Sequence, residues 1–80
     1  MMAFYSRRDK DDDSLAWYYK GNSLYNLERY EEAIECYDKT IRLKPENYNA
    51  WNNKGRSLKE LGRDDEAEEC FAKAEELDES

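Results

Sequence analysis

The side chains that could carry out chemistry in this 80-residue chain belong to few types, and histidine is absent. Histidine is the commonest metal ligand and general base, so the most frequent catalytic arrangements are excluded. Cys36 and Cys70 are too few to form a metal set alone, and we expect both to be reduced. No pattern pairs a nucleophile with a base. The sequence therefore predicts a protein that is not an enzyme and uses no metal or cofactor.

Aspartates alternate along Asp9–Asp13 with the spacing of a calcium-binding loop. That pattern fails because Ser14 stands where glycine is needed and Lys20 stands where the bidentate glutamate is needed. A solvated run of charges is the favoured interpretation. We therefore expect residues 1–13 to form a flexible N-terminal extension.

The chain is acidic, with a formal net charge of -7, and the acidity is concentrated at one end. Residues 64–80 hold nine acids and one base. Phosphates repel such a chain, which argues against nucleic acid as a partner. There is no apolar run long enough to span a membrane and no apolar stretch typical of a signal peptide near the start, so a cytoplasmic location is expected.

The chain repeats itself after 34 residues. Fourteen residues of the first unit recur without a gap in the second. Those of the first unit are Ala16, Trp17, Lys20, Gly21, Ser23, Leu24, Leu27, Arg29, Glu32, Ala33, Glu35, Cys36, Lys39 and Leu43. A period of this length predicts a stacked helical array, in which each unit buries its apolar face against its neighbour.

Apolar residues at helical spacing predict two helices in each unit. The four helices are expected at about residues 14–27, 31–43, 48–61 and 64–77. Asp13 or Ser14, Asn47 and Asp64 are expected to cap helix starts, and Gly62 to end the third helix. Gly21 and Gly55 fall inside helices, where glycine is unfavourable. We attribute both to close approach of the paired helices, with aromatic rings filling the flanks.

These features resemble the tetratricopeptide repeat (TPR) family. Its pattern is met in unit one (residues 14–47) by Trp17, Gly21, Leu24, Ala33, Tyr37, Thr40 and Pro45, and in unit two (residues 48–80) by Trp51, Gly55, Leu58, Ala67, Phe71 and Ala74. The resemblance implies an all-α fold, a fragment of a right-handed α-solenoid made of two helix-turn-helix repeats. Lys20, Lys54 and Thr40 depart from the family's usual residues.

The resemblance also implies a non-catalytic interaction module that binds a peptide or helix of another protein on its concave face. Carried over position by position, that face comprises Tyr18, Tyr19, Asn22, Tyr25, Asn26, Asn49, Asn52, Asn53 and Arg56. Tyrosine offers rigid contact area, and asparagine can bond to peptide backbone. For Tyr18 and Asn22 we favour a role in packing between helices.

Self-association is the alternative function. Two repeats are fewer than the roughly three that a stable stack usually needs, so pairing through Tyr19, Tyr25 and Tyr48, or by exchange of helix pairs, would supply burial. Glu68 and Glu75 occupy the positions of Ile34 and Ile41 in the first unit. We therefore expect the fourth helix to present a polar surface that closes the array.

Overall fold

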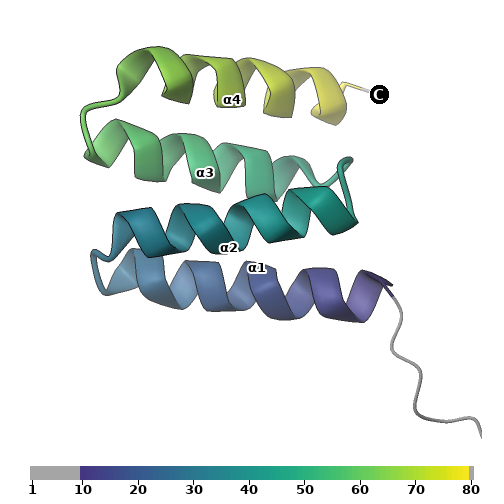
Figure 1. Ribbon diagram of the computed structural model, residues 1–80. Coiled ribbons are helices and arrows are strands. Elements are labelled where there is room, and N and C mark those ends of the chain that lie inside the picture. Colours follow the sequence, from purple (N-terminus) through teal and green to yellow (C-terminus); the bar gives the residue numbers. More distant parts are fainter. Residues whose placement is uncertain (1–9, 80) are drawn as a thin grey trace, which may run out of the picture.

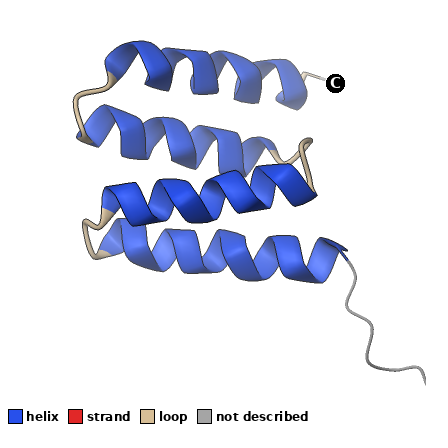
Figure 2. Cartoon of the chain, viewed as in Figure 1, coloured by secondary structure: helices blue, strands red, loops and turns tan. Residues whose placement is uncertain are grey.

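Four helices follow one another in chain order, each antiparallel to the next, in the computed structural model of the protein (Figure 1), which describes residues 10–79. They are α1 (Lys10–Asn26), α2 (Tyr30–Leu43), α3 (Tyr48–Glu60) and α4 (Asp64–Asp78). Short loops join them, and no strand occurs in this part of the chain (Figure 2). The predicted all-α fold is confirmed. None of these helices is long and apolar enough to cross a membrane.

The helix bounds agree with the predicted ones to within one residue, except at the start of α1. That helix begins at Lys10, four residues earlier than expected, so Asp13 and Ser14 lie inside it and do not begin it. The aspartates of its first turns favour this extension, because negative charge stabilises the positive end of a helix. The expectation for residues 1–9 falls outside the described part of the chain.

The turn after α1 and the turn after α3 have the same backbone geometry. Glu28 has a φ of +63° and Gly62, its equivalent in the second unit, has a φ of +80°. In each turn the next residue's N–H bonds back across the end of the helix, from Arg29 to the Leu24 carbonyl at 2.9 Å and from Arg63 to the Leu58 carbonyl at 2.9 Å. This is the Schellman ending that favours glycine, so the prediction for Gly62 is confirmed.

The helix starts differ from one another in how they are capped. Asn47 caps α3, because its side-chain oxygen accepts a bond from the Ala50 N–H at 3.1 Å, as predicted. The predicted cap at Asp64 is wrong, since Arg63 holds the cap position of α4 and makes no side-chain cap bond. The Arg63 guanidinium donates instead to Glu66 at 2.8 Å. This bond lowers the pKa of the Glu66 carboxyl.

Within each repeat, a glycine lets the two helices come close together. A β-carbon on Gly21 would lie 2.7 Å from the Tyr37 ring, and one on Gly55 would lie 2.7 Å from the Phe71 ring. Both distances are too short for atoms that do not share a bond. The interpretation of these glycines as sites of close approach is therefore confirmed.

The two repeats are joined by an apolar cluster that links α2, α3 and α4. Ile34 of the first repeat packs with Leu58, Ala67 and Cys70 of the second. The ion pair between Lys54 and Asp38, 2.7 Å long, crosses the same boundary. Among the described residues, the backbone of α3 comes close to each of the other helices, whereas the backbone of α4 comes close to α3 only and meets α2 through the Ile34 side chain.

Candidate functional site

Of the nine predicted binding residues, five come from α1 and four from α3. Six of them lie together, and we call these six the α1–α3 face: Tyr18, Tyr19, Asn22, Tyr25, Asn53 and Arg56. Although α2 separates these helices in the sequence, they are in contact. The face therefore spans the boundary between the repeats, and its geometry depends on how one repeat is placed against the other.

A hydrogen-bonded network lies at the centre of the α1–α3 face. The Asn53 amide on α3 donates to the Tyr18 hydroxyl at 3.2 Å and to Asn22 Oδ1 at 3.1 Å. The Tyr37 hydroxyl on α2 donates to the same Asn22 oxygen at 2.7 Å. Burial raises the pKa of Tyr37 well above its usual range, so this hydroxyl keeps its proton. The network ties three helices together and makes the face rigid.

The network confirms the packing role favoured for Tyr18 and Asn22, and it adds Asn53 to the same role. A variant of Asn53 would disturb the junction of the repeats as well as the surface. Sequence reasoning missed Tyr37 as a member of this network, because its position on α2 marks it as a core aromatic.

Aromatic rings and one cation surround the network. Tyr19 is 60% exposed, and the centroid of its ring lies 5.5 Å from that of the Tyr18 ring. The exposed Arg56 guanidinium lies 5.8 Å from the centroid of the Tyr25 ring. Tyr25 also makes an edge contact with Tyr30 at 5.3 Å. These contacts hold polar and aromatic groups in place at the surface.

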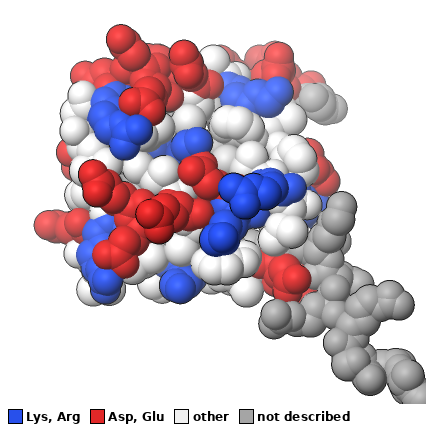
Figure 3. Space-filling view, in the orientation of Figure 1, with Lys and Arg blue, Asp and Glu red and all other residues white. Residues whose placement is uncertain are grey.

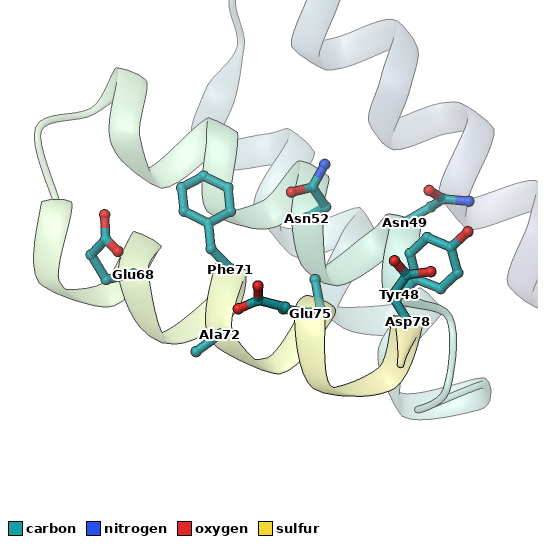
Figure 4. A pocket seen from close by; sticks show the side chains of 9 residues that line it. Tyr48, Asn49, Asn52, Glu68, Phe71, Ala72, Glu75 and Asp78 are labelled. Carbon is teal, nitrogen blue, oxygen red and sulfur yellow. The ribbon is translucent and has the colours of Figure 1, made fainter. Parts of the chain in front are cut away.

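The remaining predicted residues are not part of this group. Asn26 is exposed in the last turn of α1. Asn49 and Asn52 line an open pocket of about 540 Å³ between α3 and α4 (Figure 4). Tyr48 and Phe71 border the same pocket. The structure thus places six of the nine residues in the α1–α3 face, two at the pocket beside α4, and Asn26 in neither.

Carboxylates give the pocket between α3 and α4 an acidic rim. Glu68, Glu75 and Asp78 line it from α4 (Figure 4). Acidic side chains also gather along the edge of the molecule formed by α4 (Figure 3). The polar surface expected at α4 is thus present, but it surrounds a hollow.

The two cysteines are free and buried. Burial raises the pKa of the Cys36 thiol and of the Cys70 thiol, so both stay protonated near neutral pH. A protonated thiol is a weak nucleophile and a poor metal ligand. Within residues 10–79 no cluster of His, Cys, Asp or Glu has the size of a metal site.

Comparisons with known proteins identify the repeat. Sequence profiles described as tetratricopeptide repeat match residues 14–47 and residues 36–69, which together cover more than half of the chain. A TPR repeat-containing protein, MJ0941 of Methanocaldococcus jannaschii, is 44% identical over 36 residues, which are 45% of this chain and 11% of that protein. A crystal structure of MamA superimposes with a TM-score of 0.80 at 35% identity, over 82% of this chain and 39% of that one. The chain thus spans well under half the length of both relatives.

Proposed function

The chain belongs to the tetratricopeptide repeat family, whose fold serves generally as a protein–protein interaction module, and we propose that it binds a peptide or helix of a partner protein on the α1–α3 face. One observation carries the proposal. The hydrogen bonds of Asn53 to Tyr18 and Asn22 fix α1 and α3, the first helices of the two repeats, against each other. A surface held in this way loses little entropy when a partner binds.

The chemistry of the face favours an extended peptide. Tyr19 and Tyr25 offer flat contact area at low entropic cost, and aromatic residues of this kind dominate binding energies. Arg56, held over Tyr25, adds a cation that attracts a carboxylate of the partner.

We propose that the module is not catalytic, and the raised pKa values of both thiols support this. A cytoplasmic location stays a prediction, and the two free cysteines agree with it.

A peptide library displayed on phage, followed by fluorescence anisotropy with the selected peptides, tests this function. Arg56→Ala and Tyr25→Ala should each weaken binding by about tenfold or more, as expected for residues at the centre of an interface. Glu35→Ala on the exposed surface of α2 is the control and should leave binding unchanged. Selected peptides that bind all three variants equally would exclude the α1–α3 face.

Self-association is a second candidate, and exposed apolar side chains favour it. Leu27 is 64% exposed, although leucine recurs at its position in the second repeat, and Tyr19 is 60% exposed. Leu15 and Tyr48 are also exposed. If these groups are covered by another copy, the melting temperature should rise with protein concentration, because association stabilises the folded state by mass action.

A further inference from the structure

The pocket between α3 and α4 is equivalent, by the 34-residue repeat, to the surface of α1 and α2 on which α3 packs. We call this surface of α1 and α2 the seat of α3. Helix α3 rests on α1 and α2, where Asn53 meets Tyr18, Leu58 meets Ile34 and Lys54 meets Asp38. Moved on by 34 residues, the three seat residues Tyr18, Ile34 and Asp38 become Asn52, Glu68 and Ala72. All three of these line the pocket (Figure 4). A further helix would therefore fit there as α3 fits on α1 and α2.

Helix α1 carries the residues with which α3 occupies its seat, and in α1 they are exposed. Ala50 and Ser57 of α3 are both 0% exposed, whereas their identical equivalents on α1, Ala16 and Ser23, are exposed. Leu61 packs against the cluster formed with Leu58.

The equivalent of Leu61 on α1, Leu27, is 64% exposed. We call Ala16, Lys20, Ser23 and Leu27 the docking stripe of α1. Their four equivalents of the same types in the second repeat are buried (Ala50 and Ser57) or half-buried (Lys54 and Leu61), whereas the docking stripe is exposed.

Lys20, the lysine of the docking stripe, lies over a tryptophan ring as Lys54 does. The Lys54 ammonium lies 5.8 Å from the Trp51 ring while it pairs with Asp38. The Lys20 ammonium lies in the same way, 5.2 Å from the Trp17 ring. Lys20 therefore presents its charge as Lys54 does.

Charge and polar groups of the pocket complement the docking stripe. In the pocket, Ala72 stands at the position equivalent to Asp38, the partner of Lys54, so this carboxylate is missing. Glu68 and Glu75 lie four residues before and three residues after Ala72, on the same side of α4, and supply negative charge there instead. Inside the molecule, Asn53 of α3 pairs with Tyr18 of α1. The equivalent of Asn53 on the docking helix is Tyr19, and the equivalent of Tyr18 in the pocket is Asn52, so a tyrosine and an asparagine would again meet, with their places exchanged.

From these correspondences we propose that a second copy of this chain docks the stripe of its α1 into the pocket between α3 and α4 of the first. The proposal rests on self-association, the second candidate function, and gives it a geometry. Because the stripe and the pocket are different surfaces, a dimer still has one free stripe and one free pocket. Further copies can therefore add at both ends, and the assembly grows head to tail.

Two variants that each block one surface test the geometry by sedimentation equilibrium. Ser23→Glu places a charge in the docking stripe, and Glu68→Lys with Glu75→Lys reverses the charge of the pocket. All three positions are exposed, so the fold should persist, and circular dichroism checks this. Asn26→Glu is the matched control, because it adds the same charge to α1 at a position whose equivalent on α3, Glu60, stays exposed.

Wild type and Asn26→Glu should grow beyond dimers as concentration rises, and each blocked variant should stay monomeric. Mixing the blocked variants should give a one-to-one dimer that grows no further, because one native stripe and one native pocket remain. A mixture that stays monomeric, or a wild type that stops at dimers, would overturn the head-to-tail geometry while leaving self-association in place. A wild type that is monomeric at every concentration would overturn both, and peptide binding to the α1–α3 face would be unaffected.

Discussion

Replacing Glu28 by glycine should stabilise the protein. Glu28 has a φ of +63° in a turn whose equivalent in the second repeat uses Gly62 at +80°. A left-handed backbone costs a residue with a β-carbon about 1–2 kcal/mol. Glycine removes that cost but gives back about 0.4–1 kcal/mol through the greater freedom of the unfolded chain. The expected net gain is therefore about 1 kcal/mol.

Thermal unfolding followed by circular dichroism, at one fixed protein concentration, measures this gain. For a domain of this size, 1 kcal/mol corresponds to a shift of about 4–8 °C in melting temperature. Glu28→Ala is the matched control, because it removes the carboxylate but keeps the β-carbon, and it should stay close to wild type.

The reverse substitution in the other turn provides an independent check. Gly62→Ala should lower the free energy of unfolding by about 1 kcal/mol. No atom lies within 4 Å of the added β-carbon, so that loss reports the backbone alone. If Glu28→Gly is no more stable than Glu28→Ala, the assigned backbone cost is refuted.

Three further predictions concern the core. Ser14 is buried, and its hydroxyl has no hydrogen-bond partner among the described residues, so Ser14→Ala should raise the free energy of unfolding in urea by about 1 kcal/mol. The Ser57 hydroxyl donates to a backbone carbonyl, so Ser57→Ala should lower the same free energy by about 1 kcal/mol. Gly55→Ala should cost about 1–2 kcal/mol in the same assay, because overpacking outweighs the gain in helix propensity, and a stabilised variant would contradict the close approach. Burial raises the pKa of both thiols, so stability should be complete below the ordinary thiol pKa of about 8.5 and fall as pH rises above it. A double variant, Cys36→Ala with Cys70→Ala, should lose less stability between about pH 8 and 10 than wild type, and an equal loss would count against the thiols as the cause.

The helices and their close contacts could be predicted from the sequence. The signals that mark them are either local, such as apolar residues at helical spacing, or recur with the 34-residue period. Gly21 and Gly55 share one position of the 34-residue period, and only a packing requirement explains glycine there twice. The start of α4 was predicted correctly, but its capping residue was not, because aspartate is the better cap in general. Here the left-handed Gly62 fixes the next residue, Arg63, as the cap.

The arrangement of the α1–α3 face was less predictable, since it depends on contacts between positions far apart in the chain. Asn53 bonds to residues 31 and 35 positions earlier, and no local pattern names these partners. The left-handed Glu28 was also missed. Its signal was present, because the period aligns it with Gly62, but glutamate itself gives no indication of such a backbone.

Within the described structure, helix α4 packs along one helix only, α3, and touches α2 just through Ile34. Stability in a linear array is carried by contacts between adjacent units, so a helix held on one side opens at the lowest free energy. Its detachment would uncover Leu58 and Leu61 while the hydrogen bonds of Asn53 to α1 remain intact. We therefore expect local opening of the protein to begin with release of α4. The acidic sequence of α4 favours hydration of the released helix.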